Sequence, residues 1–272
     1  MRQTTAFRET AVFRWEIALT EFWGFMFVLV RTAAILAAIP LLGSRTVPVR
    51  VKIALAFAMA LVLMPVVSVS LSPEGLQPWN VVIGLMRELI VGMVLGLATR
   101  LLMGAVELAG SVMGFQVGFG VIGMLDPVSQ VETPVFGQLL TVLATLLYFQ
   151  VDGHHLVLLA LAASFQLIPP FAAHLGPPVL ADVVQYLQDM LVTAVRIALP
   201  VMAVTFLVHL TLGILGRLVP QMNILLTSFP LTISAGLLVL GLGLPMIAIV
   251  FQDAVFGIER MLWTLLKDLG HG

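Results

Sequence analysis

Residues 81–108 read VVIGLMRELIVGMVLGLATRLLMGAVEL, an apolar run without proline. A helix of this length is about 40 Å long, more than the roughly 30 Å of a bilayer's hydrocarbon core. Every fourth residue is glycine or charged, and rows of small residues let helices approach closely. The stretch therefore predicts a long helix that packs tightly. Its row of small and charged positions comprises Gly84, Glu88, Gly92, Gly96, Arg100 and Gly104.

This row drifts by about 40° per step around an ideal helix, so one straight neighbour cannot follow all of it. Two interpretations are open. The row packs against helices of the same chain, or it contacts another subunit. We favour the subunit contact, because the row includes the charged residues Glu88 and Arg100.

The composition of the whole chain agrees with an apolar surrounding. Its 272 residues are 60% hydrophobic and 10% charged, whereas soluble domains are about 25% charged. The formal net charge of −1 provides no basic field for nucleic acid. The chain has no cysteine, which excludes disulfides, thiolate catalysis and cysteine-ligated metals. We expect an all-α, membrane-associated protein.

Punctuated apolar runs predict about seven helices and no strands. The first run, with 21 residues, exceeds the roughly 7–15 of a signal peptide's apolar region, so we expect it to be retained. Gly176-Pro177-Pro178 marks the clearest boundary. The runs are Phe22–Leu42, Ile53–Leu71, Val81–Leu108, Val135–Val151, Leu156–Ile168, Asp182–Leu218 and Met222–Phe251.

Several charges lie inside these runs, where an unpaired charge at mid-bilayer costs about 2.5–3.5 kcal/mol. We interpret Arg31 and Arg217 as helix-end residues whose side chains extend to the polar boundary. We interpret Glu88 and Arg100 as members of a polar path or an interface.

Residues 110–127 contain five glycines between Gly110 and Gly123. Each costs a helix about 1 kcal/mol relative to alanine, so about 5 kcal/mol opposes a lone helix. Flexible backbone with soft apolar side chains suits a deformable seal that closes a pore. The alternative is a tight helix contact through Gly110, Gly114 and Gly118. The seal hypothesis assigns the plug to Met113, Phe115, Gln116, Phe119 and Met124, with Gln116 fixing its resting position by hydrogen bonding.

We predict no enzyme, no cofactor and no metal. The G-x-G-x-x-G pattern at 118–123 has no following acid at the required distance. Asp152 is expected to cap a helix beside His154 and His155 rather than to hold a metal. No hydrolase, zincin or Walker motif occurs in the sequence.

Two prolines frame a bend between the last two long helices. A hairpin turn explains this segment, and a docking surface formed by the same bend is compatible with it. The candidate packing residues here are Pro220, Gln221, Asn223, Phe229 and Pro230.

Several motifs in this order together resemble the FliR family of flagellar export-gate proteins, whose superfamily includes counterparts in virulence type III secretion. The most specific piece is Pro220-Gln-Met-Asn223, followed by Phe229-Pro-Leu231 and Gly236. The others are Pro40-Leu-Leu-Gly43 with Val47-Pro48, Gly114-Phe-Gln-Val-Gly118, Asp126-Pro127, Asp152-Gly-His-His155 and Ser164-Phe165.

The resemblance implies a subunit of the type III protein export gate, present as one copy with FliP-like and FliQ-like subunits. Residues 1–178 would form a FliP-like helical part that includes the plug at 110–127. Residues 179–272 would form a FliQ-like helical hairpin, within one continuous structural unit. The family's assembly is held largely above the bilayer plane.

The resemblance also implies FlhB-like and FlhA-like partners, unfolded secreted proteins as substrates, contact with membrane lipid, and a place in the bacterial inner membrane at the flagellar basal body. Two alternatives stay open. One is the export-gate subunit of an injectisome. The other is a secondary transporter or channel, which would use the same broken helices and buried charges to bind a small solute.

Overall fold

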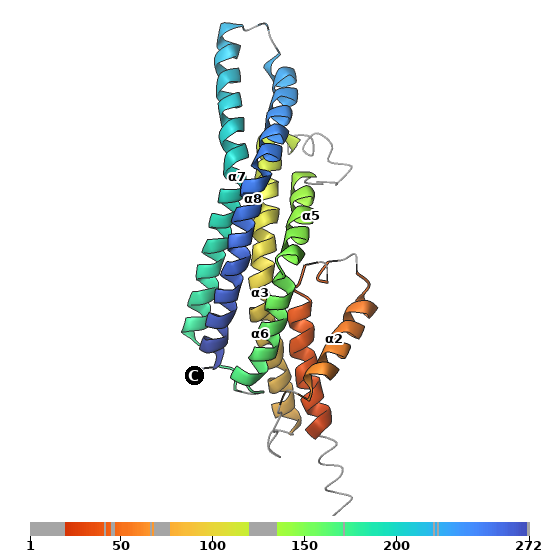
Figure 1. Ribbon diagram of the computed structural model, residues 1–272. Coiled ribbons are helices and arrows are strands. Elements are labelled where there is room, and N and C mark those ends of the chain that lie inside the picture. Colours follow the sequence, from red (N-terminus) through yellow and green to blue (C-terminus); the bar gives the residue numbers. More distant parts are fainter. Residues whose placement is uncertain are drawn as a thin grey trace, which may run out of the picture. The chain divides into compact units, whose positions relative to one another are not determined.

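A computed structural model describes residues 20–40, 42–44, 47–65, 67, 77–119, 135–170, 172–219, 221 and 223–270. All the long regular elements in this part of the chain are α-helices, which confirms the predicted all-α fold. They are a first helix over residues 20–36, α2 (Val49–Leu63), α3 (Pro78–Val117), α5 (Val135–Gln150), α6 (Gly153–Leu167), α7 (Pro177–Leu218) and α8 (Ile224–Gly270) (Figure 1).

Proline and glycine set several of the helix ends. Pro48 precedes α2, and Pro65 follows soon after its last residue. Pro78 is the first residue of α3, where its missing N–H costs nothing. Gly118, with φ +103°, ends α3 in the left-handed conformation that glycine adopts most easily.

Two helices extend well past their predicted C-terminal ends. α3 continues past Leu108 to Val117, and α8 continues past Phe251 to Gly270. The prediction for α8 ended where charged residues resume at Asp253. Hydropathy reports the surroundings of side chains, whereas backbone hydrogen bonds continue through exposed charged residues such as Asp253 and Glu259.

The described chain forms two compact units. Unit 1 comprises residues 1–100, 154–183 and 259–272, and unit 2 comprises residues 101–153 and 184–258. The long helices α3, α7 and α8 contribute to both units.

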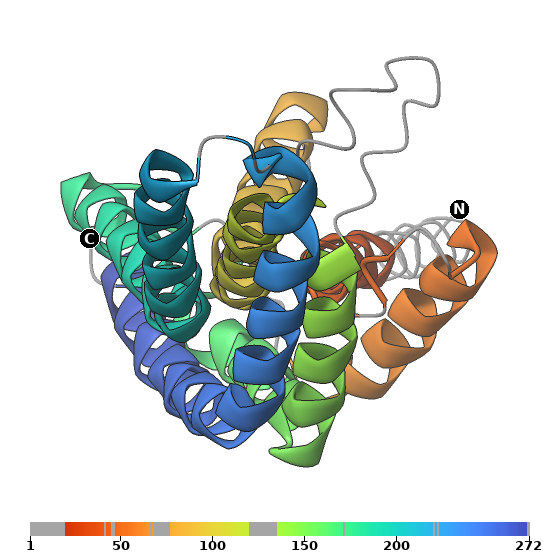
Figure 2. The same ribbon diagram turned by 90° about the horizontal axis from the view of Figure 1, so that it is seen from above.

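Each unit has its own apolar core. In unit 1 the first helix buries Phe27, Val28 and Ile35. In unit 2 α5 lies beside α8 (Figure 2). Together with α3, these helices line a partly open apolar cavity of about 170 Å³, whose lining includes Val106, Leu140 and Phe251.

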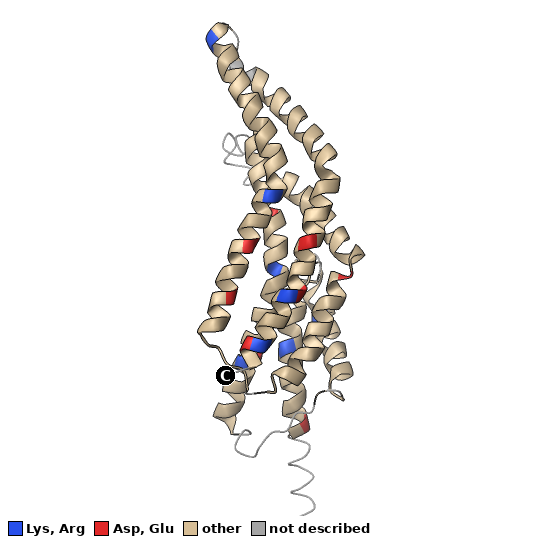
Figure 3. Ribbon diagram, turned by 60° about the vertical axis from the view of Figure 1, so that its left-hand side comes forward, with Lys and Arg blue, Asp and Glu red and all other residues tan. Residues whose placement is uncertain are grey.

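Three helices are long and apolar enough to cross a membrane: α3, α7 and α8. A fourth span would be added if the bent pair α5 and α6 counts as one. The most apolar stretch of α8 is only 11% buried, and that of α7 is 28% buried. α7 and α8 follow each other in the chain and form a hairpin. Between Arg196 and Asp253 its only charged residue in the sequence is Arg217, so most of the hairpin carries neither blue nor red in Figure 3.

Candidate functional site

The glycine row of α3 packs against the first helix within unit 1. A Cβ atom added to Gly92 would lie 2.6 Å from the Cβ of Ala34, and one added to Gly96 would lie 2.7 Å from the Cβ of Ala38. Only glycine therefore allows this separation between the two helices. The position of Glu88, one turn before Gly92, is equally covered, with 1% of the residue exposed.

For most residues of the row, these contacts favour packing within the chain over contact with another subunit. Gly84, Glu88, Gly92 and Gly96 are buried within the chain, so the prediction that they contact another subunit is wrong. Gly104 lies near Met190 of α7 inside unit 2. Arg100 is exposed, and its contact with another subunit stays a prediction.

Arg31 of the first helix forms a buried ion pair with Glu88 of α3. Its Nε donates to Oε2 of Glu88 at 2.5 Å, and the two residues are 0% and 1% exposed. The guanidinium also lies 4.4 Å from the ring centroid of Phe165. A charge pair so deeply buried is stabilising only when the remaining donors find partners.

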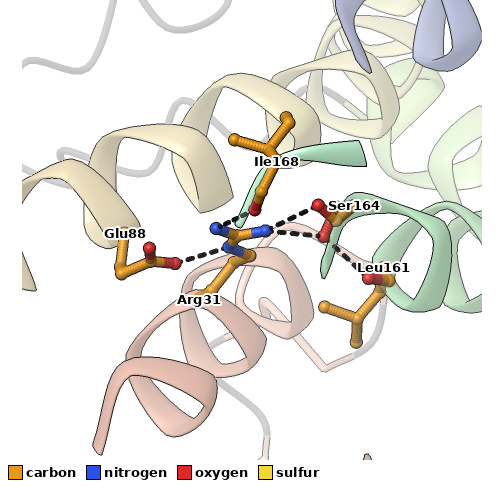
Figure 4. A network of polar contacts seen from close by, with 5 residues as sticks. All are labelled: Arg31, Glu88, Leu161, Ser164 and Ile168. Carbon is orange, nitrogen blue, oxygen red and sulfur yellow. Dashed lines mark hydrogen bonds and ion pairs between the residues drawn. The ribbon is translucent and has the colours of Figure 1, made fainter. Parts of the chain in front are cut away.

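The end of α6 supplies those partners (Figure 4). Nη1 of Arg31 donates to the carbonyl and the hydroxyl oxygens of Ser164, at 2.9 and 3.2 Å, and Nη2 donates to the carbonyl oxygen of Ile168 at 3.0 Å. The hydroxyl of Ser164 in turn donates to the carbonyl of Leu161. Because a helix C-terminus carries unpaired carbonyls and partial negative charge, a cation stabilises it.

The Arg31 network, consisting of Arg31, Glu88, Ser164, Phe165 and Ile168, thus joins three helices of unit 1. The interpretation of Arg31 as a helix-end residue reaching the polar boundary is wrong, because its side chain is completely buried. Ser164 and Phe165, which belong to one of the motifs in the sequence, contact Arg31 here. Arg217, by contrast, is exposed in the last turn of α7, as predicted for a helix end.

The first half of the glycine-rich window is part of α3 in unit 2. At Gly110 an added Cβ would meet the backbone of Gly137 in α5, so the two helices touch backbone to backbone. For Gly110 this confirms the alternative to the seal, a tight helix contact. Gly114 is less restrictive, since its nearest neighbour would be the Cβ of Phe136 at 3.9 Å.

The predicted plug residues have different surroundings. Met113 is completely buried in unit 2, so its assignment to a flexible seal is wrong. Phe115 is 64% exposed and Gln116 is half-buried. The ring of Phe119 lies 5.7 Å from that of Phe136. Met124 lies outside the described residues.

The first turns of α8 fix the end of α3. The hydroxyl of Thr232 lies 3.0 Å from the carbonyl oxygen of Val117 and also within reach of two carbonyls of its own helix. Gly236 makes room for Val117, because an added Cβ would lie 2.5 Å from its Cγ2. An added Cβ on Gly118 would lie 3.1 Å from the ring of Phe229. The chain therefore leaves α3 at Gly118 from a position set by α8.

The bend between α7 and α8 is the predicted hairpin turn. Gln221 and Asn223 are exposed, and the carbonyl of Asn223 accepts the backbone N–H of Thr227 in the first turn of α8. Pro230 is exposed inside α8, whereas Phe229 is half-buried against Gly118. Pro220 lies outside the described residues. A docking role for this bend stays a prediction.

The sequence matches a known protein family over most of its length. Residues 22–257 match the family model described as bacterial export proteins, family 1. The flagellar biosynthetic protein FliR of Bacillus subtilis (strain 168) is 32% identical over 247 residues, which cover 90% of this chain and 92% of that protein.

Two further relatives are also flagellar biosynthetic proteins FliR. That of Pectobacterium carotovorum is 30% identical over 83% of this chain and 84% of its own length, and that of Escherichia coli (strain K12) is 26% identical over 89% and 92%. Together with three helices able to span a membrane, these matches indicate a membrane protein of the flagellar export apparatus. The resemblance derived from the motifs is confirmed. The chain belongs to the bacterial export proteins of family 1, the family of the flagellar biosynthetic proteins FliR.

Proposed function

We propose that this chain is a non-enzymatic, structural subunit of the flagellar type III protein export gate in the bacterial inner membrane. It assembles as one copy with FliP-like and FliQ-like subunits, beside FlhA-like and FlhB-like proteins, around the path of unfolded flagellar proteins. The FliP-like part ends near residue 178, where α7 begins, and the α7–α8 hairpin is the FliQ-like part.

The uncovered apolar surface of the hairpin carries this proposal. Phe206, Leu238 and Leu242 are 64%, 61% and 76% exposed, and the most apolar stretch of α8 is only 11% buried. Such a surface needs lipid or other protein around it. The exposed charges Arg196 and Asp253 in the same two helices oppose full immersion in lipid, so neighbouring subunits are the better cover.

A bulky apolar substitution distinguishes a surface that faces lipid from one that packs against neighbouring subunits. Fluid lipid adapts to a larger side chain, whereas a packed interface does not. We expect Leu242→Trp to reduce co-purification of the chain with FliP-like and FliQ-like subunits and to abolish secretion of hook and filament proteins. The volume-conserving Leu242→Met is the matched control and should behave as wild type.

Normal assembly and secretion with Leu242→Trp would oppose a packed interface at this position. A chain that purified as a stable monomer and moved a small solute alone would support the secondary transporter. Deletion of the gene that abolished effector delivery but left motility intact would support the injectisome subunit.

The plug is a second part of the proposal. It now rests on Phe115, Gln116, Phe119 and Met124, since Met113 belongs to the core of unit 2. Support comes from the exposed Phe115 close to the anchored end of α3. An apolar, deformable segment there would block ions at rest and yield to a passing chain.

Deleting residues 120–127 should leave α3 intact and open the resting gate. A deletion that began at Gly110 would instead destroy the contact with α5. We expect the shorter deletion to raise membrane ion conductance above background in cells with all gate subunits. The same deletion without the FliP-like subunit is the control and should not conduct. Background conductance in the complete gate would contradict the plug.

A further inference from the structure

α2 has an apolar surface that the rest of unit 1 does not cover. Its buried residues are Ala56, Ala60 and Leu63. With 15 residues it is about 22 Å long, which is too short to cross a hydrocarbon core of roughly 30 Å. Its exposed apolar residues are Val49, Val51, Ile53, Phe57, Leu61 and Val62.

A groove runs between α2 and the first helix. The rings of Phe25 and Phe57 meet edge to face at 5.2 Å and hold the two helices together. Beyond this contact the small residues Ala33, Ala37 and Ala56 leave a partly open space of about 100 Å³. Its lining is apolar with one charged residue, Lys52.

Two cations lie in the first turn of α2, and one of them, Lys52, lines this groove. Nζ of Lys52 donates to the carbonyl of Ser44 at 2.7 Å, which uses one of its three N–H donors. Arg50, two residues earlier in α2, is exposed. The sequence has no Asp or Glu between Glu21 and Glu74, and Glu88 is already bound to Arg31. An anionic group would therefore be the complement of Lys52 and Arg50.

We propose that this groove binds an anionic phospholipid, with part of an acyl chain between the first helix and α2 and the phosphate at Lys52 and Arg50. The ligand must combine an apolar chain with a negative head, because the apolar lining and the cations are adjacent. An acyl chain also adapts to the irregular lining and to the exposed side of α2. α2 would thus lie along the membrane boundary instead of crossing it.

Lipid retention by the full-length chain, purified with its co-expressed partner subunits, tests this proposal. Native mass spectrometry in a mild detergent would compare added phosphatidylglycerol with added phosphatidylcholine. We expect wild type to retain phosphatidylglycerol preferentially, and the variants Arg50→Gln and Lys52→Gln each to lower that preference about fivefold. The exposed cation Arg217 gives the control, because Arg217→Gln should change nothing.

A second variant tests the acyl chain. Ala37→Phe should fill the groove and lower the retention of both lipids, while far-UV circular dichroism shows unchanged helix content. Equal retention of the two lipids by wild type, or unchanged preference in the double variant Arg50→Gln/Lys52→Gln, would overturn the proposal. Crosslinks from position 53 to a partner subunit, with no retained lipid, would show that protein fills the groove. None of these outcomes depends on whether the assembly exports protein.

Discussion

Arg31→Ala is expected to destabilise the protein by about 3–5 kcal/mol, because it leaves the carboxylate of Glu88 buried without its partner. The substitution also removes the donors that reach Ser164 and Ile168 at the end of α6. The midpoint of thermal unfolding in detergent, followed by circular dichroism, measures the loss. Arg100→Ala is the control on α3, since Arg100 is exposed and should change stability by no more than about 0.5 kcal/mol.

A double substitution separates the charge pair from the helix-end contacts. Arg31→Met/Glu88→Leu removes both charges, and apolar replacements of whole buried pairs are often close to neutral. The carbonyl of Ile168 still loses the guanidinium as its donor, which costs about 1–3 kcal/mol, whereas the carbonyl of Ser164 keeps the backbone N–H of Ile168. We therefore expect the double variant to be more stable than Arg31→Ala but less stable than wild type.

Equal stability of the double variant and Arg31→Ala would mean that the contacts with α6 account for the whole effect. Wild-type stability of Arg31→Ala would show that the network contributes nothing. Arg31→Lys should be intermediate, because an ammonium lacks the guanidinium fork that reaches Glu88 and α6 at the same time.

The sequence predicted the helices well but not the partners of the charged residues. Apolar runs punctuated by proline identified every described helix, since both signals are local. The pairing of Arg31 with Glu88 joins residues 57 positions apart. Nine charged residues lie in the apolar runs, and hydropathy shows only that a charge in such a run needs a partner. Hydropathy therefore does not distinguish a helix-end position for Arg31 from the buried one that it occupies.

The glycine-rich window, residues 110–127, shows a second limit of prediction from sequence. Five glycines predict an interrupted helix, and α3 does end within this window, at Val117, but only after passing Gly110 and Gly114, which together cost a lone helix about 2 kcal/mol. That cost applies to a lone helix, whereas here α5 packs closely on Gly110 and α8 on Val117. Tertiary contacts offset the local propensity, and they depend on residues far along the chain, such as Gly137 and Gly236.

Two alanine substitutions in α3 test this balance, four residues apart on the same helix. At Gly110 the added methyl would meet the backbone of α5 at Gly137, which cannot move aside by changing a rotamer. Such overpacking costs about 1–3 kcal/mol, more than the roughly 1 kcal/mol that alanine gains in helix propensity. A Cβ added to Gly114 would lie 3.9 Å from its nearest neighbour, which is ordinary van der Waals contact. No steric cost therefore opposes the gain in helix propensity at this position. We expect Gly110→Ala to lower the midpoint of thermal unfolding and Gly114→Ala to raise it.

The larger Gly110→Leu extends the prediction from stability to export. A leucine there must push α5 away from the end of α3, which lies seven residues further on at Val117. If the position of that end controls the passage of substrates, Gly110→Leu should abolish motility even where the protein still assembles. Gly241→Leu is the control for thermal stability alone, because an added Cβ at Gly241 has nothing within 4 Å in this chain, whereas its neighbour Leu242 lies in the proposed subunit interface. A motile Gly110→Leu strain with normal thermal stability would contradict the close contact between α3 and α5.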